Sequence, residues 1–157
     1  MTTAGSRMLV GVLVGCFVGA VSVAAQQQGM MRPDRGMVMS KYGYDETVSR
    51  VKQAIEGQQM MVLFTADHQQ MLSMVQVKAP PMSTIEFFHP RYGKRIFEGN
   101  REASPEIPLR ILVMEGDKGA MVTWVKPSTT IGKYKGLESL GTELDSTLQQ
   151  IATSVTK

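Results

Sequence analysis

The sequence predicts an α+β domain, in which a predominantly antiparallel sheet carries helices on one face. Short apolar runs of strand length follow one another between residues 60 and 126, with no long helical pattern between them. Two of these runs are joined by Gly116-Asp117-Lys118-Gly119, a four-residue loop typical of a hairpin. One amphipathic segment lies near each end of the domain, so the expected order is β-α-β-β-β-β-α.

The first half of the domain is expected to run strand, helix, strand. Residues 37–44 are interpreted as a strand that ends where Asp45 can cap a helix through its side-chain oxygen. Aliphatic residues at spacings of three and four predict a helix over 46–56, and Gly57 follows as a stop signal. Residues 60–66 form a dense apolar run of strand length.

The second half is expected to add three strands and a closing helix. Alternating or continuous β-forming residues mark the strands, and a long stripe of aliphatic residues at helical spacing marks the helix. The expected elements are a short helix at 68–76, strands at 84–88, 109–115 and 120–126, and a helix at 137–155. Residues 89–108 are expected to form a long loop.

The N-terminus divides the chain into a signal peptide at 1–25, a flexible tether at 26–36 and a folded domain at 37–157. Arg7 is the one charged side chain before the end of the signal, and an uncharged apolar run follows it. Small residues then precede the glutamine tract after Ala25, which is typical of a secretory cleavage site. The expected location is therefore the periplasm or the external medium.

Two alternatives keep the protein at a membrane. The uncharged apolar run of 18 residues lies at the lower limit for a spanning helix, so an uncleaved anchor is one of them. Leu13-Val14-Gly15-Cys16 also resembles a lipobox, in which Cys16 would carry the lipid. Cys16 is the single cysteine, so cleavage after Ala25 would leave no thiol and would exclude disulfides, zinc-thiolate sites and cysteine nucleophiles.

Charge gives no indication of a nucleic-acid partner. Of 17 basic residues only Arg7 precedes Ala25, while all 14 acidic residues follow it, so the mature chain is nearly balanced. The densest basic stretch, residues 91–95, is the closest match to the basic stripe with interleaved aromatics of a nucleic-acid surface, but Glu98 and Glu102 follow it and dilute its charge.

The pattern resembles the DUF302 family, which has a TT1751-like fold of the TBP-like kind, over roughly residues 40–150. The resemblance rests on these segments in this order: YDETVSRVKQAI, FTADH, EFFHPRYGKRIFE, IPLRILVMEGDKGAMVTWVKP and KGLES. It implies a β-α-β4-α core and association as homodimers, and it implies no reaction. The chain departs from the family pattern at Phe87-Phe88-His89-Pro90, where Phe-Gly-Asn-Pro is expected, and at Gln69-Gln70-Met71, where an alanine-rich helix is expected.

The adjacent Asp67 and His68 are the first candidate site. Neighbouring strand residues point to opposite faces, so the pair converges only at a turn into a helix, where Asp67 is also a suitable N-cap. His89 is the second histidine. If strands 60–66 and 84–88 are antiparallel neighbours, His68 and His89 lie about 17–20 Å apart, whereas a parallel crossover would bring them together. The candidate ligand-binding residues are Asp67, His68 and His89.

Methionine is the second unusual feature, with 13 in 157 residues. Thioethers suit Cu(I), and Met37 and Met39 share one face of a predicted strand, so they are candidate metal ligands. The alternative is adaptable packing in the core. That interpretation is applied to Met60, Met61, Met71, Met74, Met114 and Met121.

These features favour an exported, non-enzymatic binding module for a small molecule, a metal or a partner protein, with no cofactor predicted. The binding surface is expected where Asp67, His68 and the 89–108 loop lie, because connecting segments tend to carry function. The alternative is a small periplasmic enzyme in which His68 is a general base oriented by Asp67. The sequence holds neither a Gly-x-Ser-x-Gly elbow nor a glycine-rich phosphate loop.

Overall fold

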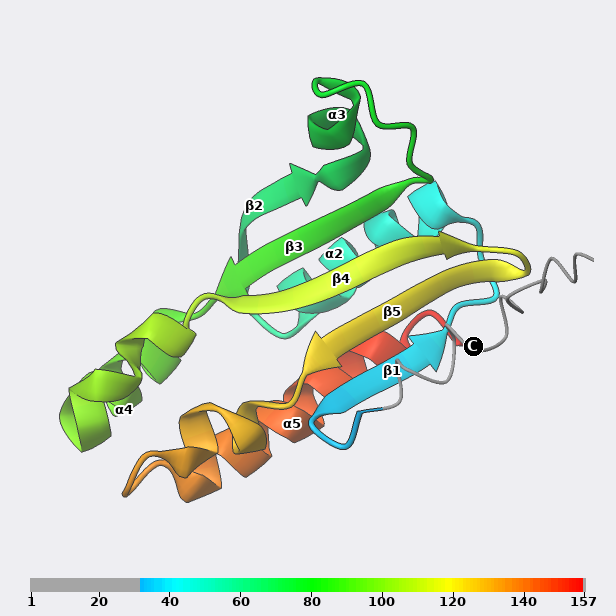
Figure 1. Cartoon of the computed structure of the whole chain (residues 1–157). Helices are drawn as coiled ribbons and strands as arrows, with labels where there is room; N and C mark the ends of the chain where they lie inside the picture. The colour runs from blue at the N-terminus through cyan, green and yellow to red at the C-terminus, as the bar shows by residue number, and fades with distance from the viewer. Residues whose placement is uncertain (1–31, 157) are drawn as a thin grey trace, which may run out of the picture. The chain divides into compact units, whose positions relative to one another are not determined.

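A five-stranded sheet forms the centre of the computed structural model, which describes residues 32–156. The strand order is β1-β5-β4-β3-β2, and every neighbouring pair is antiparallel (Figure 1). The strands are β1 (Arg35–Met39), β2 (Met61–Asp67), β3 (Met82–Phe88), β4 (Leu109–Gly116) and β5 (Gly119–Val125). The first strand therefore pairs with the last one, and β1 and β2 are the edges of the sheet.

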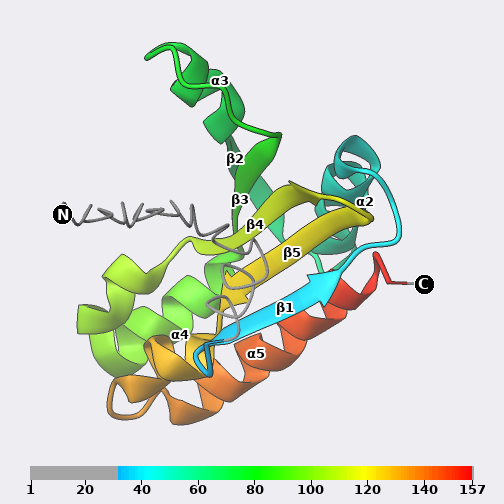
Figure 2. The same cartoon turned by 45° about the vertical axis from the view of Figure 1, so that its right-hand side comes forward.

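Two long helices cover one face of this sheet. Helices α2 and α5 lie behind the sheet in Figure 1, and Figure 2 shows α5 running along the side of β1. The helices are α2 (Tyr44–Gly57), α3 (His68–Ser73), α4 (Pro90–Asn100) and α5 (Glu138–Thr153), with 3₁₀ turns η1 (Arg101–Glu106), η2 (Pro127–Thr129) and η3 (Ile131–Lys133). The α+β class and the covering of the sheet from one side are thus confirmed.

The hydrophobic core lies between the sheet and these two helices. Alternate strand residues point into it and are fully buried, among them Ile85 and Phe87 of β3 and Val122 of β5. Val51 and Ile55 of α2 meet them at the helical spacing that the sequence predicted, as do Leu140, Leu144, Leu148 and Ile151 of α5. Because side chains alternate along a strand, the residues between the core positions lie on the opposite face.

The start of the domain differs from the expectation. Strand β1 begins at Arg35, within the predicted tether, and ends at Met39 rather than at residue 44. Helix α2 has Gly43 at its N-cap with no side-chain bond there, so the predicted capping by Asp45 is wrong. Asp45 lies instead in the first turn, where its charge complements the helix dipole. The predicted signal peptide lies outside the described residues.

The predicted loop at 89–108 is wrong, because most of this segment is helical. Pro90 occupies the first turn of α4, where its missing N–H costs nothing. The Nδ1 atom of His89 accepts a hydrogen bond from the Arg91 amide at 3.0 Å and so caps this helix. Tyr92 and Ile96, one helical turn apart, are buried. Gly93 of the same helix lies against Phe88, where a Cβ would come within 2.6 Å of the ring.

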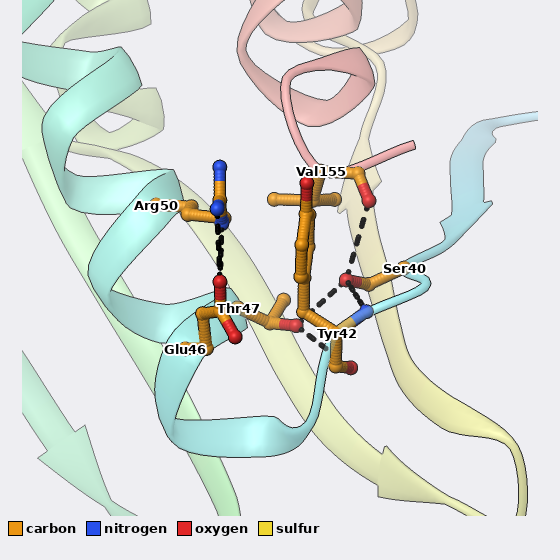
Figure 3. A network of polar contacts seen from close by, with 6 residues as sticks. All are labelled: Ser40, Tyr42, Glu46, Thr47, Arg50 and Val155. Carbon is orange, nitrogen blue, oxygen red and sulfur yellow. Dashed lines mark hydrogen bonds and ion pairs between the residues drawn. The ribbon is translucent and has the colours of Figure 1, made fainter. Parts of the chain in front are cut away.

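A buried polar network joins the end of β1 to α2 and to the segment that follows α5 (Figure 3). The Ser40 hydroxyl lies 2.7 Å from that of Thr47 on α2 and accepts from the Tyr42 amide at 3.1 Å. It also donates to the carbonyl of Val155, 115 residues further along the chain, at 3.3 Å. Ser40 and Thr47 are almost completely buried. The Arg50 guanidinium stacks over the Tyr42 ring, with its central carbon 3.8 Å from the ring centroid. Arg50 is partly exposed and so covers the network on its solvent side.

Replacing the central hydroxyl tests how much this corner contributes. We expect Ser40→Ala to lower the free energy of unfolding by about 1–3 kcal/mol, because the Tyr42 amide and the buried Thr47 hydroxyl lose their hydrogen bonds to Ser40. The measurement is urea unfolding followed by the fluorescence of Trp124, the single tryptophan, which is buried. Ser146→Ala, on the exposed side of α5, is the matched control and should change stability by less than about 0.5 kcal/mol. Equal unfolding midpoints for the two variants would contradict the role of Ser40.

Candidate functional site

Asp67 begins α3. It is the last residue of β2, and its Oδ1 atom accepts a hydrogen bond from the Gln70 amide at 2.9 Å. This is the N-cap geometry that the sequence predicted for this position. The carboxylate thus satisfies one of the amides that the first turn of a helix leaves without an internal partner.

His68 is held by a different neighbour. Its Nε2 atom lies 2.7 Å from the hydroxyl of Thr84 on the adjacent strand β3, and the side chain is half-buried. Asp67 and His68 therefore bond to separate groups, as the alternation of a strand predicts. In this arrangement Asp67 does not orient the imidazole, which an acid–base pair would require.

His89 lies at the other end of the same two strands. Met61 pairs with Phe88 and Asp67 with Ser83, so the chain enters α3 at one end of the β2–β3 pair and reaches His89 at the opposite end. The antiparallel alternative is confirmed, and the two histidines are not brought together. Within residues 32–156, no group of three or more His, Cys, Asp or Glu side chains could hold a metal ion.

An open depression of about 900 Å³ lies beside α3. Its lining includes Asp67, Gln70, Ser73, Val77 and Lys78, and His68 is not part of the lining. The lining offers amides, one hydroxyl, one carboxylate and one ammonium group. The Ser73 hydroxyl donates to the Gln70 carbonyl at 2.6 Å.

Tyr44 links this end of the sheet to the core. Its hydroxyl lies 2.6 Å from the hydroxyl of the buried Ser83, which pairs with Asp67 across the strands. Burial raises the pKa of Tyr44, and the nearby carboxylates of Asp67 and Asp45 raise it further, against the hydrogen bond from Ser83. The raised pKa keeps the Tyr44 hydroxyl neutral in the folded protein. Its contribution to the stability of the folded state is therefore fully present below the ordinary tyrosine pKa and is lost as the pH rises through the raised pKa.

Met37 and Met39 lie on the same face of β1, the face turned away from the helices. Met39 pairs directly with Met121 on β5, Met121 with Met114 on β4, and Met114 with Met82 on β3. These four residues, which we name the methionine row, place one thioether on each of four neighbouring strands. Met39 is half-exposed, and the other three are partly exposed.

The prediction of core packing for the other methionines is wrong for most of them. Only Met60 of the six is buried in the core. Met61, Met71 and Met74 are exposed, and Met114 and Met121 belong to the methionine row. The sequence could not reveal the row, because its members come together only through the pairing register of the strands.

A second feature that the sequence analysis missed is the apolar segment, residues 61–77, which comprises β2, α3 and the turn after it. Seven of the ten exposed large hydrophobic side chains of the described chain lie there: Met61, Leu63, Phe64, Met71, Met74, Val75 and Val77. Asp67 is the one charged residue among these seventeen. Both views show α3 projecting beyond the end of the sheet (Figures 1 and 2). The signal was visible in the sequence as a long run with a single charge.

A five-stranded antiparallel sheet covered from one side by two helices defines the class of this protein as a two-layer α+β domain. The chain belongs to the DUF302 family, since the family model described as "Domain of unknown function DUF302" matches residues 37–155. The predicted resemblance is confirmed.

A solved structure supports the same fold. The crystal structure of an uncharacterized conserved DUF302 protein from Bacillus stearothermophilus is similar with a TM-score of 0.74 and 16% sequence identity. The match covers 79% of this chain and 99% of that chain. At this identity the likeness concerns the fold alone. None of the curated proteins compared with the chain matches it.

The cap of α3 can be tested without disturbing the core. We expect Asp67→Ala to cost this six-residue helix about 0.5–2 kcal/mol, which should speed amide hydrogen exchange at Gln70 and Met74. Asp45→Ala is the control, since Asp45 is also in a first helical turn but makes no capping bond. If exchange at Gln70 were the same in both variants and the wild type, Asp67 would not be a functional cap.

Proposed function

We propose that this protein is an exported, non-enzymatic binding module that binds a partner protein through the apolar segment, and that its first partner is a second copy of itself. The observation that carries this proposal is the concentration of exposed hydrophobic side chains on residues 61–77. Such a concentration of exposed apolar side chains along one segment is typical of an interaction site.

The composition of the apolar segment fits a protein partner better than a lipid surface. Protein interfaces are depleted of charge at their centre and enriched in methionine and aromatic residues. Helices that lie on membranes carry lysine and arginine on their polar face, whereas residues 61–77 contain neither. Met71, Met74 and Val75 are spaced by three and four residues, so they form one apolar stripe on and just beyond α3.

A second copy is favoured by the position of this segment. Strand β2 is an edge strand, so one side of its backbone has no strand neighbour within the described sheet. Two copies related by a two-fold axis can bury the same segment against itself, and such closed dimers are the commonest homo-oligomers. The family resemblance implies the same association.

The non-enzymatic part of the proposal is supported by the contacts of the two candidate catalytic residues. Asp67 is engaged by the Gln70 amide and His68 by the Thr84 hydroxyl. General base catalysis by His68 with Asp67 as its orienting group would require both side chains to leave these contacts. Their present roles are to start α3 and to fix it against β3.

Export is proposed from the composition of residues 1–25 alone. In the part of the chain that the structure describes, no helix has the length and hydropathy needed to cross a bilayer.

Charge introduced into the apolar segment should prevent self-association. We expect the wild-type protein to sediment as a dimer and Val75→Glu to sediment as a monomer, because the carboxylate would be desolvated at the interface. Sedimentation velocity over a range of concentrations measures this directly. Phe97→Glu is the matched control, because Phe97 on α4 has the same exposed fraction of 68% as Val75.

Two results would count against this interface. One is a wild-type protein that stays monomeric at every concentration. The other is equal dissociation of the Val75→Glu and Phe97→Glu variants, which would show that added charge acts at a distance from the apolar segment.

The maturation of the chain distinguishes the alternatives for its N-terminus. We expect intact-mass analysis of the protein from envelope and culture-medium fractions to give a chain that begins at Gln26. Cys16→Ser should leave both processing and location unchanged. A lipid-modified chain beginning at Cys16, or an uncleaved chain retained in the membrane, would contradict cleavage after Ala25.

A further inference from the structure

The methionine row is not what strand propensity would select. Strands favour β-branched and aromatic residues, yet four directly paired positions on four strands all hold methionine. All four lie on the face that α2 and α5 leave uncovered, so packing against these two helices does not explain them. Such a regular placement of one residue type on a partly exposed surface calls for a chemical reason.

We propose that the row binds a soft monovalent cation, Cu(I) or Ag(I), through the thioethers of Met39, Met121 and Met114. Soft sulfur ligands select Cu(I), and a thioether is such a ligand without needing to lose a proton. This site goes beyond the proposed protein–protein interface. It lies on β1, β5 and β4, and β3 separates these strands from β2.

The spacing of the row suits shared coordination. Directly opposed residues on one face of an antiparallel pair have Cβ atoms about 4.5–5.5 Å apart. Each methionine has three rotatable bonds beyond its backbone, so neighbouring sulfur atoms can turn toward a common ion without movement of the strands. Met121 stands between Met39 and Met114 and is the natural centre of the site.

The position of the Met39 side chain supports this convergence. Its Cε methyl lies 3.8 Å from the place where a Cβ on Gly116 would stand. Gly116 is on β4, two residues after Met114 and on the same face, whereas Met39 starts on β1. The Met39 side chain therefore reaches over β5 toward the strand of Met114. At 3.8 Å this methyl is at ordinary van der Waals distance from that position.

The surroundings favour a soft ion over a hard one. The adjacent row on the same face consists of Met37, Thr123, Leu112 and Thr84, which are paired in that order. No member of either row is a carboxylate or an imidazole, and the His68 imidazole that reaches the adjacent row is bonded to Thr84 at its β3 end. Ca²⁺, Mg²⁺ and Zn²⁺ would therefore find few ligands of the kind they prefer. Met37 adds a further thioether two residues from Met39.

Because thioether ligands are neutral, the pH dependence of the affinity distinguishes this site from one built of histidines or carboxylates. A histidine or carboxylate site loses affinity as its ligands are protonated, but thioethers do not titrate. Affinity for Ag(I) should therefore be the same at about pH 5.5 and about pH 7.5, the range across which histidine changes charge.

The test consists of two titrations of the purified protein, each against a chromogenic competing chelator. One uses Ag(I), which is redox-inert, and the other uses Cu(I) under anaerobic conditions. Methyl NMR of the methionines reports which side chains respond. We expect one ion per chain, shifts of the Met39, Met114 and Met121 methyl signals, and no pH dependence.

Two double variants provide the comparison. Met114→Leu/Met121→Leu should lose the ion, whereas Met71→Leu/Met74→Leu, which removes two exposed methionines outside the row, should retain it. Leucine nearly conserves the volume of methionine, and unfolding midpoints will confirm that both variants fold. Val75→Glu should also retain the ion, so the site can be tested independently of the dimer.

Several outcomes would overturn the proposal. These are no binding in competition with the chelator, equal loss in the two double variants, or affinity that falls at acid pH as a histidine site would. Methyl shifts confined to methionines outside the row would overturn it even if the variants failed to fold.

Discussion

The structure depends on a single constraint: the sheet has two faces, and α2 and α5 cover only one of them. The covered face supplies the core, in which Ile85, Phe87 and Val122 are fully buried against the two helices. The other face must remain compatible with water while its strands stay paired. It does so with threonines, with an Arg110–Glu86 ion pair whose charged atoms are 3.8 Å apart, and with methionines at most of its remaining apolar positions on β1, β5, β4 and β3.

Because only one face of the sheet is covered, polar side chains on the covered side are buried and spend their hydrogen bonds on the fold instead of on a ligand. Ser40 and Thr47 are buried at the corner of the covered side and satisfy one another and the backbone, so they have no capacity left for a ligand. In residues 32–156 no buried side-chain nitrogen or oxygen lacks a hydrogen-bond partner. Both proposed interaction surfaces consist of hydrophobic side chains and thioethers rather than of buried polar groups.

The parts of the structure that sequence reasoning predicted are those set by local rules. The Asp67 cap, the helix through Val51 and Ile55 and the hairpin after β4 each depend on residues within a few positions of one another. The sequence did not predict helix α4, because a proline such as Pro90 is common both in loops and in the first turn of a helix. The methionine row was missed for another reason, since its members lie up to 82 positions apart and meet only through the register of four strands.

The pairing of β1 with β5 also has a consequence for how the chain folds. The first strand has no neighbour in the sheet until the last strand has been made, and the Ser40 bond to Val155 forms only after the whole closing helix exists. Closing so long a loop costs little more in equilibrium stability than closing a short one, but such distant contacts slow folding. A chain that emerges N-terminus first therefore carries β1 without its strand partner until β5 has been made. During synthesis the backbone N–H and C=O groups of β1 must be satisfied by water instead of by a ladder.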